Sequence, residues 1–148
     1  MIDDIDVQII NSILANSRKA LTEIAKEIDI SNVAIQQRLK KLEKKGIIES
    51  YTSKINYKAL GYTTIAFIGI FLEKAKDYRS VISQLKAISE ISEAHFTTGN
   101  YSIFAKVYAK NNDHLMEILN TQVQLIDGIA RTETFISLEE GILKPMYL

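Results

Sequence analysis

The residues best suited to chemistry in this chain lie in one short stretch, SNVAIQQRLKKLEKKG, which runs from Ser31 to Gly46. Amide side chains come first, at Asn32, Gln36 and Gln37, and most of the cations follow them. Asn and Gln can pair with adenine through two hydrogen bonds in the major groove of DNA, while Lys neutralises phosphate. The stretch therefore suggests a helix that contacts DNA.

Helical spacing separates a buried side of this stretch from an outward side. Ile35, Leu39 and Leu42 recur at helical intervals and are expected to face the rest of the protein. The residues expected to read base edges are Asn32, Val33, Gln36 and Gln37. Those expected to contact phosphates are Ser31, Arg38, Lys40, Lys41 and Lys44, together with Lys54 on the segment that follows. The alternative is an ordinary solvated helix face. Such a face would not require the amide side chains to come before the basic ones along the helix.

The charge of the chain is balanced overall but not locally. The 148 residues carry 18 Lys and Arg and 18 Asp and Glu. Between residues 31 and 58, however, seven basic residues occur with only two acidic ones, Glu43 and Glu49. Counterion release depends on the phosphates that are touched, so a local basic patch is enough to bind nucleic acid.

The composition, 47% hydrophobic and 24% charged, is typical of a globular chain with a core. The chain contains no Cys, which excludes thiolate catalysis, disulfides and Cys-bound metals and suits a reducing cytoplasm. The opening MIDDIDVQII is acidic, unlike a signal peptide, and no apolar run approaches the roughly 20 residues of a membrane span. We expect a cytoplasmic protein without a membrane partner.

Three helices are expected in the first part of the chain. The first ends near Asn16, the second covers about 21–28, and the third about 32–45. Ser31 is a good N-cap for the third helix, and Gly46 suits the positive φ of a C-terminal cap. Two short helices joined by a tight turn, the second of them basic, predict a helix-turn-helix.

Beyond the third helix the pattern changes to strands. Residues 47–51 and 52–55 are expected to form a small hairpin, or wing, and 57–61 a linker. The elements expected after the linker are a strand at 63–73, a helix at 77–88, strands at 91–98 and 101–110, a helix at 112–126 and a strand at 129–140. This β-α-β-β-α-β order predicts a ferredoxin-like sandwich. The expected fold class is α+β, with a winged helix-turn-helix domain over 1–60 and a ferredoxin-like domain over 61–148.

The first strand of the sandwich is apolar on both sides. Ile65, Phe67 and Phe71 alternate with Ala66 and Ile68. Two helices can cover only one face of the sheet, and an apolar strand needs cover on both. A second copy of the chain is the simplest cover, so we expect a homodimer.

The segment DDIDVQIINSILANSRKALTEIAKEIDISNVAIQQRLKKLEKKGIIESYTSKINYKALGY resembles the DNA-binding half of the Lrp/AsnC (feast/famine) transcription regulators. The resemblance lies in the acidic and apolar opening and in the motifs LTEIAKEIDIS, RLKKLEKKGII and YTSKINYKALG. The later β-α-β-β-α-β segment resembles the ligand-sensing and oligomerisation domain of that family. Each short motif is common by itself, but the ordered combination over essentially the whole chain is specific.

The resemblance implies a cytoplasmic, nucleoid-associated regulator that binds operator DNA as dimers, often assembled into octamers. It also implies that the second domain binds a small effector, usually an amino acid, between dimers. Asp29 stands where the family usually has Gly in the helix-turn-helix turn, a position that Asp can occupy at some cost. Ser102 stands where the family commonly has Asp in its effector loop, which leaves the effector's identity open.

The loop between the second and third strands of the sandwich is the expected effector site. Its residues are Thr97, Thr98, Gly99, Asn100, Tyr101 and Ser102. Their hydroxyls, the amide and the backbone N–H groups are of the kind that can hold a carboxylate. A plain hairpin turn is the alternative.

Two other functions stay open at this point. An enzyme would need a catalytic constellation, but His95 and His114, the only histidines, have no partners at the spacing of a metal site or a nucleophile–base pair. We therefore expect no enzyme, no metal and no cofactor. The second alternative is an architectural DNA-binding protein without effector sensing.

Overall fold

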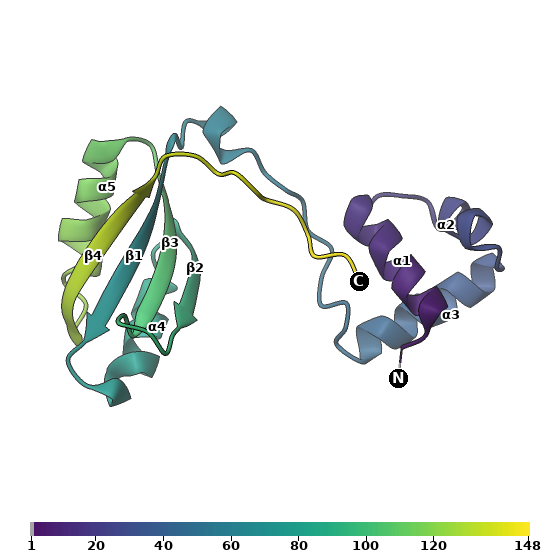
Figure 1. Ribbon diagram of the computed structural model, residues 1–148, viewed down its shortest axis with the longest axis horizontal. Helices are drawn as coiled ribbons and strands as arrows, with labels where there is room; N and C mark the ends of the chain where they lie inside the picture. Colours follow the sequence, from purple (N-terminus) through teal and green to yellow (C-terminus); the bar gives the residue numbers. More distant parts are fainter. Residues whose placement is uncertain (1) are drawn as a thin grey trace. The chain divides into compact units, whose positions relative to one another are not determined.

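The computed structural model describes residues 2–148, which form two compact units (Figure 1). The helical unit contains the residues up to Lys54 and also the segment Ile142–Leu148, which we call the tail. The sheet unit contains Ile55–Gly141. Within residues 2–148, no helix has the length and apolar character needed to cross a membrane.

The helical unit contains α1 (Asp4–Ala15), α2 (Leu21–Ile28) and α3 (Asn32–Lys44). Two of these helices begin at a side-chain cap, which satisfies a backbone N–H group that has no partner inside the helix. Asp3 caps α1 by accepting from the backbone N–H of Asp6 at 2.9 Å. Ser31 caps α3 by accepting from the backbone N–H of Ala34 at 3.2 Å. The three predicted helices and the predicted cap at Ser31 are confirmed.

Two residues with positive φ follow α2 and α3. Asp29 has a φ of 58°, in the left-handed region, and Gly46 has a φ of 67°. Both turns are therefore made as the sequence predicts. Four side chains form the almost inaccessible centre of the unit: Ile9, Ile24, Ile35 and Leu42. Because α1, α2 and α3 all contribute to this centre, α3 is held firmly with one stripe turned inward.

The prediction of two wing strands is wrong. Residues 47–55 are all described, and they contain no strand. A two-stranded hairpin is at best marginal unless it packs on something, and Ile47, Tyr51 and Ile55 all stay exposed. The expected linker holds a short 3-10 helix, η1 (Tyr57–Leu60), which belongs to the sheet unit.

The sheet unit has the predicted β-α-β-β-α-β order. Its elements are β1 (Thr64–Leu72), η2 (Ala75–Asp77), α4 (Tyr78–Leu85), β2 (Ile91–Phe96), β3 (Ile103–Ala109), α5 (Asn112–Ile118), the π-helical turn η3 (Leu119–Val123) and β4 (Ile129–Ser137). The strands form one antiparallel sheet in the order β2-β3-β1-β4. This order confirms the expected ferredoxin-like sandwich.

The two faces of the sheet differ in their cover. Helices α4 and α5 pack on one face, where residues such as Ile68 and Val107 form the core with Val81 and Leu115 (Figure 1). The opposite face, which we call the aromatic face, carries stacked and edge-on rings. These rings are Phe67, Phe71, Tyr101, Phe104 and Phe135. Neither α4 nor α5 covers the aromatic face, although Tyr57 of η1 packs on Tyr108 on the same side of the sheet.

Candidate nucleic-acid interface

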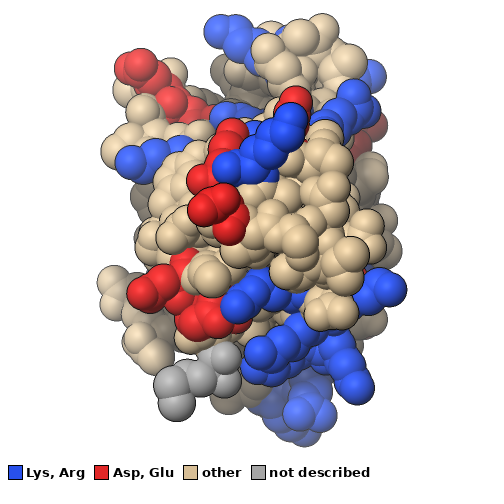
Figure 2. Space-filling view, turned by 90° about the vertical axis from the view of Figure 1, so that its right-hand side faces the viewer, with Lys and Arg blue, Asp and Glu red and all other residues tan. Residues whose placement is uncertain are grey.

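The predicted outward side of α3 is exposed. The four residues expected to read bases, Asn32, Val33, Gln36 and Gln37, are all exposed. The three lysines expected to contact phosphates, Lys40, Lys41 and Lys44, are exposed as well. Val33 keeps 62% of its surface accessible. On the side of the helical unit shown in Figure 2, Lys and Arg side chains gather at the lower right, next to a smaller acidic group.

The length of α3 suits the division into amides and cations. A helix rises about 1.5 Å per residue, so Asn32 and Lys44 are separated by roughly 18 Å along its axis. The major groove is about 12 Å wide, so the amide-bearing half can lie in the groove while the lysines beyond it reach the flanking phosphates. Ser31 lies at the N-terminal end of α3, and its hydroxyl proton stays available to a phosphate while its oxygen caps the helix.

Arg38 has a different role from the one expected. Its Nη1 atom donates to both carboxylate oxygens of Asp3 at 2.8 Å and to Oδ1 of Asp6 at 2.6 Å. These bonds, first to Asp3 and then to Asp6, raise the pKa of Arg38, and the bond from Arg38 lowers the pKa of Asp3. Asp6 is only 1% exposed, so the cluster ties α3 to the start of α1. A guanidinium balanced by two carboxylates attracts phosphate weakly, and we remove Arg38 from the candidate phosphate contacts.

Lys54 is held in another way. Its Nζ atom donates to the backbone carbonyl of Leu143 in the tail at 3.1 Å. A carbonyl oxygen orients an ammonium group without cancelling its charge. Lys54 is therefore directed by the protein and still free to attract a phosphate.

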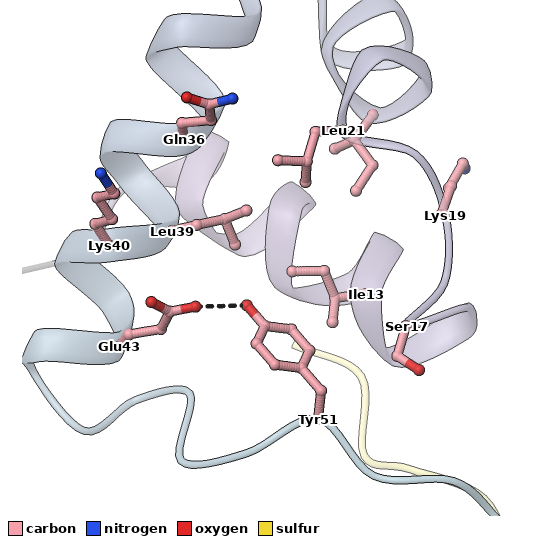
Figure 3. A pocket seen from close by; sticks show the side chains of 10 residues that line it. Ile13, Ser17, Lys19, Leu21, Gln36, Leu39, Lys40, Glu43 and Tyr51 are labelled. Carbon is pink, nitrogen blue, oxygen red and sulfur yellow. Dashed lines mark hydrogen bonds between the residues drawn. The ribbon is translucent and has the colours of Figure 1, made fainter.

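A hollow of about 410 Å³ lies on one flank of α3 (Figure 3). Gln36 and Lys40 border it from α3, and Tyr51 closes its lower side. The hydroxyl of Tyr51 donates to Oε1 of Glu43 at 2.9 Å. Partial loss of water around this hydroxyl, together with the carboxylate, raises the pKa of Tyr51 although the residue as a whole is exposed. This bond fastens the irregular segment after α3 to the helix itself. The sequence holds no signal for it, because the two residues follow no capping or pairing pattern.

The expected effector loop is partly engaged in its own hydrogen bonds. The backbone N–H of Thr97 donates to the carbonyl of Ser102 at 3.1 Å, and the Thr97 hydroxyl donates to the carbonyl of Tyr101. The backbone N–H of Ser102 donates to the carbonyl of Ile70 at 2.9 Å. The three residues at the tip of the loop, Thr98, Gly99 and Asn100, are exposed. Free polar groups of the loop are therefore concentrated at its tip.

Tyr101 points away from this tip and lies on the aromatic face. Its ring is directly above Gly69, where an added Cβ would come within 2.5 Å of it. Its hydroxyl donates to Oε2 of Glu133 at 2.8 Å, and this bond raises the pKa of Tyr101. Arg131 donates to the other oxygen of Glu133 and lies 3.5 Å from the centre of the Phe71 ring. Of the six expected effector residues, three thus form an exposed tip, while Thr97, Tyr101 and Ser102 are partly buried.

Two family models match the chain, and together they cover most of it. Residues 2–49 match a winged helix-turn-helix DNA-binding model, and residues 65–145 match the Lrp/AsnC ligand binding domain. The chain belongs to the Lrp/AsnC family of transcription regulators. Helix α3 is the second helix of its helix-turn-helix, which is the helix that reads DNA in this motif.

Individual Lrp/AsnC proteins resemble this chain over nearly their full lengths. The regulatory protein AsnC of Escherichia coli K12 is 40% identical over 144 residues, which are 97% of this chain and 95% of that protein. The solved structure of E. coli AsnC has a TM-score of 0.94 at 38% identity and covers 100% of this chain and 99% of that one. A feast or famine regulatory protein from M. tuberculosis complexed with L-methionine has a TM-score of 0.90 at 25% identity and covers 97% of this chain and 96% of that one. The chain is accordingly a helix-turn-helix transcription regulator with a ligand-binding domain.

Proposed function

We propose that this Lrp/AsnC regulator recognises its operator with the outward side of α3. Asn32, Val33, Gln36 and Gln37 would face base edges in the major groove. Ser31, Lys40, Lys41, Lys44 and Lys54 would contact phosphates. The observation that carries the proposal is the order of side chains along α3. Exposed amides lie in its N-terminal half, exposed lysines lie in its C-terminal half, and the other side of the helix is buried. A solvated helix face would not require that order.

We further infer that the second part of the chain, from about residue 61, senses a small amino acid and that the first 60 residues carry most of the DNA contact. The match to a ligand-binding domain and the relative with bound L-methionine support an amino-acid effector. The exposed tip at Thr98, Gly99 and Asn100 supplies backbone and side-chain donors for a carboxylate. Such an effector acts only if it binds one assembly or DNA-binding state better than another.

We also propose that a second copy covers the aromatic face and that such dimers associate further, up to an octamer, on chromosomal DNA in the nucleoid. A face of five clustered rings without a covering helix supports the dimer. The competing function is an architectural DNA-binding protein that senses nothing. Calorimetry with the twenty amino acids, combined with DNA binding in their presence, distinguishes the two, because the architectural protein would show neither heat nor a change in affinity.

Two classes of substitution test the proposed DNA contacts. Lys40→Ala or Lys41→Ala should weaken binding to every sequence and reduce the slope of log K against log salt by about one each. Gln37→Ala should instead reduce discrimination at one base pair by about 1–3 kcal/mol. The measurement is a DNA shift titration on operator and random duplexes at several salt concentrations. Equal loss on both duplexes for Gln37→Ala would contradict the assignment of base readout.

A further inference from the structure

A second hollow in the helical unit lies outside the helix-turn-helix. Its volume is about 630 Å³, and it is bounded by the end of α1, by residues 50–54 and by Pro145 and Tyr147 of the tail. Arg18 and Lys54 line it, together with the hydroxyl-bearing residues Ser17, Ser50, Tyr51, Thr52, Ser53 and Tyr147. No acidic residue is among its lining residues. Two cations with hydroxyl donors and without a carboxylate form a surface complementary to an anion.

This hollow neighbours the one on the flank of α3. Both are lined by Ile13, Ser17 and Tyr51. The flank hollow in turn reaches Gln36 and Lys40 on α3 (Figure 3). The two neighbouring hollows, which we call the track, therefore lie between α3 and the pair of cations, and Glu43 is the one acidic residue that lines them. A duplex gripped by α3 has its sugar–phosphate backbone beside the groove, where such a track can follow it.

The tail forms one wall of the track and is fastened to α1. The side-chain amide of Asn11 donates to the backbone carbonyl of Leu148 at 2.9 Å, and the backbone N–H of Leu148 donates to Oδ1 of Asn11 at 2.9 Å. Further back, the Leu143 carbonyl accepts from Lys54. An ammonium group has three donors, so two of those on Lys54 remain for a phosphate. The tail thus restricts a flexible side chain that would otherwise lose rotamer freedom on binding.

We propose that this hollow is a second contact site for the DNA backbone, in which Arg18 and Lys54 contact phosphates and the tail positions Lys54. The proposal rests on the proposed function, because it places the duplex by the entry of α3 into the major groove. It adds Arg18 to the phosphate contacts and makes Ile142–Leu148 a part of the DNA-binding surface.

The test uses the full chain and compares salt slopes. Arg18→Gln and Lys54→Gln remove one charge from each protomer, and each should reduce the slope of log K against log salt by about 0.9 for every protomer that contacts the DNA. Between 50 and 200 mM salt, each variant should then lose about threefold less affinity than the parent chain for every such protomer. Lys86→Gln, at an exposed lysine of the sheet unit, is the matched control and should leave the slope unchanged.

The tail is tested by Asn11→Ala, which removes both hydrogen bonds to Leu148 and keeps a good helix former. Gln8→Ala, at an exposed position of the same helix, is its control. Asn11→Ala should reduce DNA affinity in the parent chain but have no further effect in the Lys54→Gln background, because the tail acts through Lys54. Removal of residues 142–148 should reproduce Asn11→Ala, with the thermal unfolding curve checking that the helices stay folded.

The outcomes separate the two proposals. Unchanged salt slopes for Arg18→Gln and Lys54→Gln overturn the second contact site, whatever Gln37→Ala does. Full additivity of Asn11→Ala with Lys54→Gln, or no effect of Asn11→Ala, overturns the positioning role of the tail. Reduced slopes with no loss of discrimination in Gln37→Ala would support this site and contradict base readout by α3.

Discussion

At the scale of single residues, a basic side chain on the second helix of a helix-turn-helix can stabilise the fold through ion pairs and need not contact DNA. Arg38 and Lys40 are two positions apart on α3, but Arg38 is turned toward Asp3 and Asp6 while Lys40 is exposed. Lys54 shows a third arrangement, because its partner is a neutral carbonyl. What decides the role is therefore the partner's charge, and the type of basic residue is secondary.

The pairing of Asp3 with Arg38 gives stability that depends on pH. The bond from Arg38 lowers the pKa of Asp3 below its usual 3.8, so the unfolded chain takes up a proton at a higher pH than the folded one. The stabilisation is fully present above about pH 5 and is lost as the pH falls through the lowered pKa. Asp3→Asn keeps an oxygen for the N-cap but removes the charge. Urea unfolding should show Asp3→Asn less stable than the parent at neutral pH, with the difference shrinking below about pH 4.

Asp6 is the other carboxylate that binds Arg38. The control for the loss of one acidic group is Asp4→Asn. Asp4 lies in the same first turn, and within residues 2–148 it makes no bond to Arg38. A difference between Asp3→Asn and the parent that stays the same from neutral to acidic pH would contradict the ion pair as its source.

The sequence predicts which residues of α3 point outward but not what Arg38 binds. Helical periodicity determines direction, and the outward residues are exposed as expected. The partners of Arg38 lie 35 and 32 residues earlier, and only the packing of α1 on α3 brings them together. Asp3 and Asp6 are recognisable in the sequence as residues suited to the start of a helix. Because that role already explains them, the sequence does not indicate that they also bind Arg38.

At the scale of elements, the segments with strong local signals are those that the sequence predicts well. Caps at Ser31 and Gly46 and the apolar spacing of α1, α2 and α3 depend on neighbouring residues only. The wing has no such signal, and its expected pairing is replaced by a side-chain bond from Tyr51 to Glu43. In the sheet unit, the alternation of β1 predicts both faces, while the position of Tyr101 over Gly69 depends on the register of β1 with β3.

Gly69 tests the contact between β1 and the expected effector loop. A Cβ at Gly69 would lie 2.5 Å from the Tyr101 ring, so Gly69→Ala should displace the ring and break its bond to Glu133. We expect a loss of about 1–3 kcal/mol in the free energy of unfolding and a changed near-ultraviolet circular dichroism signal. The effector response should weaken, while the salt slope of DNA binding stays the same.

Gly99→Ala is the control for stability alone, because an added Cβ there meets nothing within 4 Å while the residue itself lies in the proposed effector tip. Equal free energies of unfolding for the Gly69→Ala and Gly99→Ala variants would mean that the Tyr101 ring moves aside without cost. That result would contradict a fixed position of this ring on the aromatic face.

At the scale of the whole molecule, the aromatic face predicts how copies of the chain associate. Phe135 lies on that face and is 46% exposed. Phe135→Lys would place a charge where a second copy is proposed to pack, and the cost of burying it should convert dimers to monomers at micromolar concentration. Light scattering measures the change. Leu125→Lys, at a residue that is 72% exposed, should leave the dimer intact. Monomers in the parent chain would contradict the proposed dimer at once.

The order of the elements was predictable across the whole molecule, but the place of the tail was not. The composition of GILKPMYL indicates packing on some surface, and it does not indicate which one. The bonds that decide this join Asn11 to Leu148 across 137 positions. Contacts of that separation leave no periodic or capping pattern in a single sequence.

The division of the helical unit between the two ends of the chain has a consequence for synthesis. A ribosome releases α1, α2 and α3 first, and these helices can pack as soon as they emerge. The tail emerges only after the whole sheet unit, so Lys54 lacks its bond to Leu143 until residues 142–148 have been made. A nascent chain can therefore hold a folded helix-turn-helix and lack its complete DNA-binding surface. If the tail belongs to the DNA-binding surface, as proposed, that surface is completed only after residues 142–148 have emerged from the ribosome.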